Sequence, residues 1–104
     1  MARFDPLIHQ PARLRIMAAL NALGPDEEVE FGLLQSALEL TPGNLGSHLR
    51  KLEDAGYIAT RKTFVRRRPR TYVRLTPRGR YAFHEHVEAL HEMLDAKPIP
   101  RDSA

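Results

Sequence analysis

Two runs of side chains near the middle of this sequence have the chemistry to bind a partner rich in negative charge. The first run combines hydroxyl, amide, imidazole and cationic groups, and its members are Thr41, Asn44, Ser47, His48, Arg50 and Lys51. The second run places four arginines within five positions, at Arg66, Arg67, Arg68 and Arg70. Guanidinium and ammonium groups are cationic donors, while amide and hydroxyl groups both donate and accept hydrogen bonds. This set of groups favours a role in binding and recognition over a role in catalysis.

Groups that would support catalysis or metal binding are scarce in the sequence. The chain has no cysteine, which excludes disulfides, thiolate metal sites and thiol nucleophiles. It also has no Gly-x-Ser-x-Gly elbow and no glycine-rich loop that would cradle a phosphate. His84, Glu88 and His91 have a helical spacing that suits a metal ion, but helices rich in these residues produce such triplets by chance. We therefore predict no enzyme activity, no metal site and no cofactor.

The charge of the chain is unevenly distributed, although its net value is only +3. Residues 55–84 contain nine lysines or arginines and no aspartate or glutamate, whereas residues 1–54 contain five basic and eight acidic residues. This division predicts that one region of the surface meets an anionic macromolecule. The length of 104 residues and the 42% hydrophobic content predict one globular domain at 1–97, followed by a flexible tail at 98–104.

The sequence shows no sign of a signal peptide or of a membrane span. The residues after Met1 lack the apolar stretch that a signal peptide needs. No apolar run approaches the roughly 18 residues that a membrane-spanning helix requires. We expect a cytoplasmic protein of a prokaryote that is associated with the nucleoid and has no membrane partner.

Start and stop signals for helices divide the chain into a definite order of elements. Proline in a first turn, threonine before a proline and glycine after an apolar run mark helix ends. Runs of Ile, Val, Thr, Tyr and Phe predict two strands around an arginine-rich loop. The expected elements are helices at 11–23, 32–40, 42–55 and 77–97, strands at 29–31, 58–65 and 71–75, and a loop at 66–70. The predicted fold class is mainly α with a small β-wing (α+β), a winged helix-turn-helix in the order α-β-α-α-β-β-α.

The helix expected at 42–55 has an apolar stripe and an opposite polar arc. Leu45, Leu49 and Leu52 fall within about 60° of one another on a helical wheel and are expected to face the core. The polar arc is either an ordinary solvated face or a surface that enters the major groove of DNA. The short helix before it and the basic hairpin after it favour the groove. Its predicted DNA-binding residues, with base contacts from the N-terminal half, are Thr41, Gly43, Asn44, Ser47, His48, Arg50 and Lys51.

The expected hairpin is a second candidate for contact with DNA. Arginines on a narrow loop suit the minor groove, where A·T-rich sequences concentrate negative potential, or the phosphates beside it. The alternative is an edge hairpin that carries charge only to stay soluble, but such charges are usually lysines or mixed signs. The predicted DNA-binding residues of this wing are Lys62, Arg66, Arg67, Arg68, Arg70 and Thr71.

Several short motifs together resemble winged-helix regulators of the ArsR/MarR superfamily, and the resemblance covers almost the whole chain. The motifs are Ser-His-Leu at 47–49, Leu-Glu-x-Ala-Gly at 52–56, Arg-Arg-Pro-Arg-Thr at 67–71 and Thr-Pro-Arg-Gly-Arg at 76–80. The resemblance implies homodimers on near-palindromic double-stranded DNA operators, where they repress or, less often, activate transcription. It also implies that a small-molecule effector can bind. Gly46 departs from the family, which often has a small hydroxyl residue there, so this position offers no side-chain bond to a phosphate.

The helix expected at 77–97 has an apolar arc of roughly 160°, which is wider than one packing partner requires. Either the whole arc is covered within one chain, or part of it packs against a second copy across a two-fold axis. The excess width and the resemblance favour the second copy. His86 lies within the arc, where it is expected to pack rather than to bind a ligand. The predicted dimer interface consists of Leu7, Ile8, Phe83, His86, Val87, Leu90, Met93 and Leu94.

These observations predict a sequence-specific transcriptional regulator, most simply a repressor, that acts as a homodimer. Its recognition helix would enter the major groove, and its arginine-rich wing would contact the minor groove or phosphates. Two alternatives remain open from the sequence. One is an architectural or chromatin protein that binds DNA with little sequence preference, and the other is a winged-helix module that binds an acidic protein.

Overall fold

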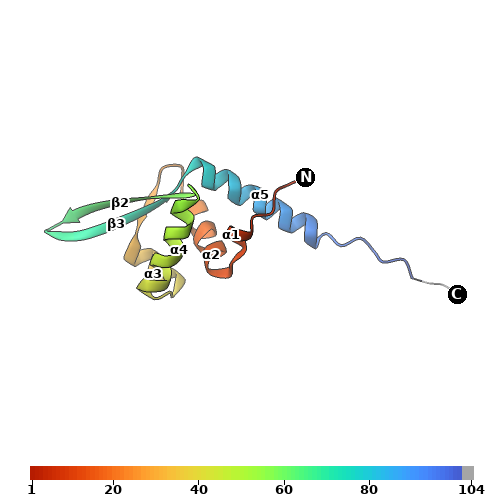
Figure 1. Cartoon of the computed structure of the whole chain (residues 1–104), viewed down its shortest axis with the longest axis horizontal. Coiled ribbons are helices and arrows are strands. Elements are labelled where there is room, and N and C mark those ends of the chain that lie inside the picture. Colours follow the sequence, from red (N-terminus) through yellow and green to blue (C-terminus); the bar gives the residue numbers. More distant parts are fainter. Residues whose placement is uncertain (102–104) are drawn as a thin grey trace.

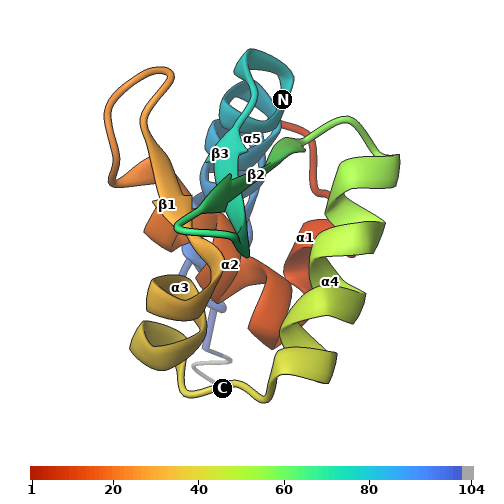
Figure 2. The same cartoon turned by 90° about the vertical axis from the view of Figure 1, so that its left-hand side faces the viewer.

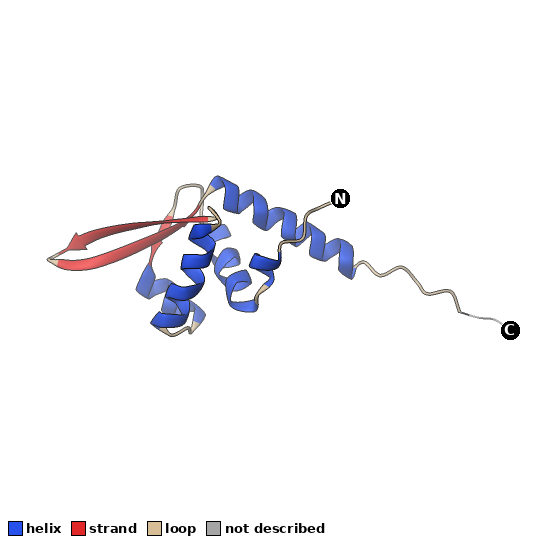
Figure 3. Ribbon diagram, in the orientation of Figure 1, coloured by secondary structure: helices blue, strands red, loops and turns tan. Residues whose placement is uncertain are grey.

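The computed structural model describes residues 1–101 and confirms the predicted fold class of helices with a small β-wing (Figure 1). Helices cluster around one end of a long β-hairpin, as the colouring by secondary structure in Figure 3 makes plain. In chain order the elements are α1 (Pro6–His9), α2 (Pro11–Asn21), β1 (Glu28–Glu30), α3 (Phe31–Leu38), α4 (Pro42–Asp54), β2 (Ile58–Val65), β3 (Arg68–Leu75) and α5 (Pro77–Leu94). Among residues 1–101, no helix is long and apolar enough to cross a membrane.

The two threonine–proline signals start helices as predicted. The Thr41 hydroxyl accepts a hydrogen bond from the Asn44 amide at 3.1 Å, and the Thr76 hydroxyl accepts one from the Gly79 amide at 3.0 Å. These side chains satisfy amides in the first turn that have no partner within the helix. Both α4 and α5 therefore begin at a fixed residue, and α4 is the helix expected to carry the polar arc.

Helix α1 was not predicted, although its start has the same chemistry. The Asp5 carboxylate accepts from the amides of Leu7 and Ile8, and Pro6 occupies the first helical position. With four residues, α1 is too short to show an apolar period, which is the main signal for a helix. At the other end of the chain, α5 stops at Leu94 rather than at the predicted Lys97. Residues 98–101 of the predicted tail have no regular structure, and residues 102–104 lie outside the described part.

The three strands form one antiparallel sheet in the order β1-β3-β2, and β2 and β3 extend from it as the wing. The predicted five-residue loop at 66–70 is wrong, because Val65 pairs with Arg68 and only Arg66 and Arg67 form the turn. Both turn residues are left-handed, with φ of 52° and 67°, which is the geometry of a tight two-residue hairpin. Pro69 is tolerated in β3 because β1 pairs only with residues 72–74, so the edge of β3 at Pro69 has no strand beside it.

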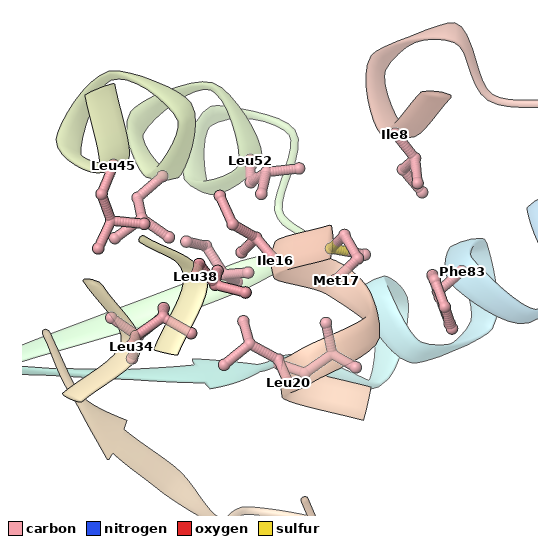
Figure 4. Close-up of a cluster of buried hydrophobic side chains, with 13 residues drawn as sticks. Ile8, Ile16, Met17, Leu20, Leu34, Leu38, Leu45, Leu52 and Phe83 are labelled. Carbon is pink, nitrogen blue, oxygen red and sulfur yellow. The ribbon is translucent and has the colours of Figure 1, made fainter. Parts of the chain in front are cut away.

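One hydrophobic core holds α4 and the wing in place (Figure 4). Leu45, Leu49 and Leu52 are buried, as the helical wheel predicted. They belong to the same buried cluster as Ile16 of the central helix α2, which contacts α3, α4, α5 and β3.

Gly79 fixes the start of α5 against the chain that follows α4. A Cβ at Gly79 would lie 2.0 Å from the carbonyl oxygen of Tyr57, so no other residue fits without movement of the backbone. The Thr76 amide donates to that same carbonyl at 3.0 Å. This close packing of backbone accounts for the glycine in the Thr-Pro-Arg-Gly-Arg motif.

Candidate DNA-binding surface

Helix α4 presents its predicted polar arc to solvent beside the base of the wing. Viewed from the wing tip, α4 lies on one side of the hairpin while β1 and α3 lie on the other (Figure 2), and α4 contacts β2 directly. Most of the predicted recognition residues are exposed, namely Thr41, Gly43, Asn44, Ser47, Arg50 and Lys51. Asp54 is also exposed, at the C-terminal end of α4 and far along the helix from Asn44.

Two glycines of α4 are not required by packing among residues 1–101. A Cβ built on Gly43 or Gly46 would meet no described atom within 4 Å. Glycine inside a helix costs roughly 0.5–1 kcal/mol relative to alanine, so these positions weaken the helix with no gain in the core. They leave the helix backbone accessible along the side that also carries Ser47. A partner of α4 can therefore approach its backbone closely.

His48 is held by a residue that sequence reasoning missed. The Nη1 atom of Arg13, on α2, lies 3.1 Å from Nδ1 of His48, and the Arg13 Nε donates to the carbonyl of Leu7 at 2.6 Å. Because a guanidinium only donates, Nδ1 of His48 must accept, and the proton of the neutral ring is on Nε2. Partial burial, with the nearby charges of Arg13 and Lys51, lowers the pKa of His48. His48 is thus a half-buried neutral ring with one fixed tautomer.

The register of the hairpin divides the wing into two faces with different chemistry. Directly paired residues of antiparallel strands point to the same face, and neighbours along a strand point to opposite faces. Ile58, Val73 and Leu75 are buried, so the face that they share is the core-side face. Toward the tip, the core-side face continues with the pairs Lys62–Thr71 and Phe64–Pro69, and the outer face with Thr63–Arg70 and Val65–Arg68.

The predicted wing residues therefore do not all point the same way. Lys62 and Thr71 are opposite one another on the core-side face, whereas Arg68 and Arg70 are on the outer face. The remaining two arginines form the turn at the tip. All four arginines and Lys62 are exposed, while Thr71 is partly buried.

Some other arginines of the chain bond within the protein instead of being free to contact a partner. Arg61 forms an ion pair with Glu28 and lies over the ring of Tyr72. Arg80 donates to the carbonyls of Asn21 and Leu23, at the end of α2. In contrast, twelve cationic side chains make no hydrogen bond or ion pair within residues 1–101. Those on α4 and the wing strands or turn are Arg50, Lys51, Lys62, Arg66, Arg67, Arg68, Arg70 and Arg74, and the others are Arg3, Arg78, Lys97 and Arg101. Eight of the twelve therefore belong to α4 or to the wing.

The residues predicted for a dimer interface differ in how deeply they are buried. Ile8 and His86 have 0% exposure and Phe83 has 9%, so these three side chains pack inside one protomer. Leu7, Val87 and Leu90 are partly buried. Met93 and Leu94 are 65% and 77% exposed at the end of α5. The surface that remains for a second copy is therefore narrower than predicted and lies toward the C-terminal end of α5.

The sequence analysis identified His86 as a packed residue but missed the residues that surround it. Its Nδ1 accepts from the Asp5 amide at 2.9 Å, and its Nε2 lies 3.2 Å from Nδ1 of His9. The ring of Phe4 lies 4.8 Å from the imidazole of His9 and 4.9 Å from that of His86, centroid to centroid. Within the described residues, no group of histidine, aspartate and glutamate is arranged to hold a metal ion.

The exposed helix α4, the helix α3 that precedes it and the cationic wing define a winged helix-turn-helix DNA-binding domain. Comparison with known families agrees, because a model of the winged helix DNA-binding domain matches residues 12–94. The chain belongs to this family. The solved structures similar to the chain include transcriptional regulators.

Individual relatives support the same class. A transcriptional regulator homologue from Pyrococcus horikoshii is 36% identical, with a TM-score of 0.70 over 86% of this chain and 89% of that one. A MarR-family regulator from Enterococcus faecalis is 27% identical, with a TM-score of 0.65 over 84% and 74% of the two chains. An uncharacterized protein of Methanocaldococcus jannaschii is 37% identical over 78% of this chain and 85% of its own length. The resemblance to winged-helix regulators inferred from the motifs is confirmed.

Proposed function

We propose that this winged-helix protein is a sequence-specific repressor that binds a near-palindromic operator as a homodimer and has no catalytic activity. The observation that carries the proposal is the placement of the unpaired cations. The unpaired cations of α4 and the wing lie on two adjoining elements, whereas Arg13, Arg61 and Arg80 form hydrogen bonds or ion pairs within the fold. Phosphate contacts supply most of the affinity of such proteins for DNA, and base contacts supply the specificity.

Base recognition in this proposal comes from the N-terminal half of α4. Asn44 and Ser47 are exposed and carry groups that can bond to base edges in the major groove. The Nε2–H of His48 is a donor for a base or a phosphate. Gly43 lets the backbone at the start of α4 come close to the DNA, where the helix dipole favours a phosphate.

Dimerisation in this proposal uses the exposed end of α5. Met93 and Leu94 are large apolar side chains in water at the end of an 18-residue helix, beside the partly buried Leu90. Packing across a two-fold axis removes this apolar surface from water. It also places two copies of α4 on one face of the DNA, about 34 Å apart, which is one helical turn. Occupation of a promoter by such a dimer would block transcription.

Competition between DNA duplexes tests this function against its two alternatives. The labelled probe is an operator duplex selected by the protein, and the competitors are the same duplex and one of scrambled sequence. A regulator requires at least about a hundredfold more scrambled competitor for equal displacement, because specific sites bind about 10³-fold or more tighter than random ones. Equal competition would indicate an architectural protein, and no binding at low salt would favour a protein-binding module.

A further inference from the structure

The wing carries an exposed aromatic side chain that the fold does not use. Phe64 is 73% exposed. It precedes Val65, which is the last residue of β2 before the turn. On the core-side face, the last fully buried side chain toward the tip is Val73, which pairs with Thr60. Phe64 lies two pairs of residues farther out on the same face. The hairpin projects beyond the helices at its tip (Figure 1), and most of the Phe64 side chain is left in water.

Phe64 is paired across the hairpin with a second apolar residue. Pro69 is its direct partner on β3 and is also exposed. Side chains at directly opposite positions are about 5 Å apart, close enough for the ring to lie beside the pyrrolidine. Together they form an apolar spot on the core-side face of the wing tip, beside the four arginines of the tip. The positive charge around this spot disfavours an apolar protein partner and matches a polyanion that also offers apolar surface.

The dimensions of the hairpin determine which part of a DNA groove each wing residue can reach. Paired strands are about 4.8 Å apart, and the minor groove of B-DNA is about 6 Å wide. Only the tip, with Arg66 and Arg67, fits between the two backbones. Side chains just behind the tip then lie over the two walls of the groove, one face of the hairpin against each wall.

We propose that Phe64, supported by Pro69, packs against the deoxyribose groups of one wall of the minor groove, while Arg68 and Arg70 neutralise phosphates of the other wall. The carbon-bound hydrogens of deoxyribose give this wall an apolar surface that an aromatic ring can cover. This inference rests on the proposed binding of duplex DNA and adds an uncharged contact to the wing.

The contact also distinguishes DNA from RNA duplexes. The minor groove of A-form RNA is wide and shallow and displays 2′-hydroxyl groups. A narrow wing tip placed there cannot reach both walls at once, and the ring of Phe64 meets hydroxyls instead of carbon-bound hydrogens. The wing therefore favours DNA over RNA of the same sequence.

A matched pair of substitutions near the tip tests the proposal. Phe64→Ala removes the ring from the core-side face, whereas Val65→Ala shortens the neighbouring side chain on the outer face. With a selected operator duplex, Phe64→Ala should raise Kd about five- to tenfold, because a few tens of Å² of apolar surface then stay in water. Val65→Ala should change Kd less than about twofold, and Phe64→Leu should recover most of the affinity.

Two further readouts separate a sugar contact from a role in hairpin structure. The slope of log K against log salt should be unchanged in Phe64→Ala, since every phosphate contact is retained. Hydroxyl-radical footprinting reports access to deoxyribose hydrogens in the minor groove, and it should show protection at the outer ends of the operator. That protection should disappear with Phe64→Ala and persist with Val65→Ala.

Failure of this inference differs from failure of the proposed function. If the wild-type protein binds no duplex at low salt, the proposed function is wrong and the wing contact falls with it. If the wild-type protein binds its operator but the two alanine variants give the same Kd and the same footprint, only the sugar contact is overturned. A change in sedimentation with Phe64→Ala would also overturn it, because the ring would then be a contact between copies of the protein.

Discussion

The Nδ1 atom of His86 accepts a hydrogen bond from the backbone amide of Asp5 at 2.9 Å, in a site with 0% exposure of the imidazole. A backbone amide only donates, so Nδ1 of His86 is unprotonated and the proton of the neutral ring is on Nε2. That proton points to Nδ1 of His9, 3.2 Å away. The Asp5 carboxylate also caps α1 and accepts from the Tyr57 hydroxyl. Neutral His86 thus fastens the N-terminal segment to α5.

Acid should loosen this attachment and destabilise the fold. Burial, and then the neighbouring His9, lower the pKa of His86, while Asp5 acts in the opposite direction. The unfolded chain then binds more protons than the folded chain below the ordinary histidine pKa of about 6.5. The stability from neutral His86 is fully present above that pH and is lost as the pH falls toward the lowered pKa of the folded protein.

Chemical unfolding from about pH 8 to about pH 5 measures this dependence. Each tenfold difference in proton affinity between the folded and unfolded states is worth about 1.4 kcal/mol in the free energy of unfolding. His86→Gln should give a flatter pH profile, and His84→Gln, at an exposed position of the same helix, should keep the wild-type profile. Parallel profiles for wild type and His86→Gln would contradict the assignment of the pH dependence to His86.

Arg13 should control both the ionisation of His48 and the affinity for DNA. Its charge is, after burial, the second cause that lowers the pKa of His48. Arg13→Met removes the charge and the hydrogen bond to Nδ1, so the pKa of His48 should rise and its ring should no longer keep one tautomer. Operator affinity should fall by a few-fold to about tenfold, which corresponds to the free energy of one hydrogen bond.

Nuclear magnetic resonance of the imidazole nitrogens checks the pKa and the tautomer together. Arg15→Met is the matched control, because Arg15 is on the same helix and donates to the carbonyl of Leu38 instead. His48 should titrate as in the wild type in this control. An unchanged pKa of His48 in Arg13→Met would show that Arg13 does not act on the ring.

The wing arginines should contribute to binding through phosphates and therefore through salt dependence. Removal of one phosphate contact should reduce the slope of log K against log salt by about 0.9. If each protomer neutralises about four phosphates, the slope of the dimer is near −7. Combined Arg66/Arg67/Arg68→Ala substitution should flatten it for operator and random duplexes alike.

Arg61→Ala serves as the control for this series. Arg61 is on the same hairpin, but its charge is already paired with Glu28. The slope of log K against log salt for Arg61→Ala should stay close to that of the wild type. The same slope in the triple variant and in the wild type would mean that the wing does not contact DNA.

The end of α5 should determine the oligomeric state. Leu94→Glu places a charge on the apolar surface that we assign to the dimer, so it should shift sedimentation toward a monomer and weaken operator binding. Leu33→Glu makes the same change at a 66% exposed leucine on α3 and should leave the mass unchanged. A monomeric wild-type protein at micromolar concentration, or a dimeric Leu94→Glu variant, would refute this interface.

Local signals in the sequence were sufficient for most of the fold. Thr41–Pro42 and Thr76–Pro77 mark helix starts with chemistry that does not depend on the rest of the chain, and both were predicted correctly. The wing turn was missed because Arg68 and Pro69 are poor strand residues. They lie in β3 because pairing with β2 continues to Val65 and because the other edge at Pro69 is free.

Long-range contacts account for what the sequence did not reveal. The bond between Arg13 and His48 joins residues 35 positions apart, and that between Asp5 and His86 joins residues 81 apart. No periodicity or spacing reports such pairs. The helical wheel identified the apolar arc of α5, but only the structure shows that Phe83 and His86 are covered within one protomer.

Selection from random DNA duplexes tests the central claim most directly. The protein is mixed with a random library, and bound duplexes are recovered and sequenced over several rounds. We predict a short inverted repeat with half-sites about one helical turn apart, whose preferred bases change with Asn44→Ala or Ser47→Ala but not with Arg67→Ala. Recovered sequences that share no motif would contradict the assignment of this protein as a sequence-specific dimeric regulator.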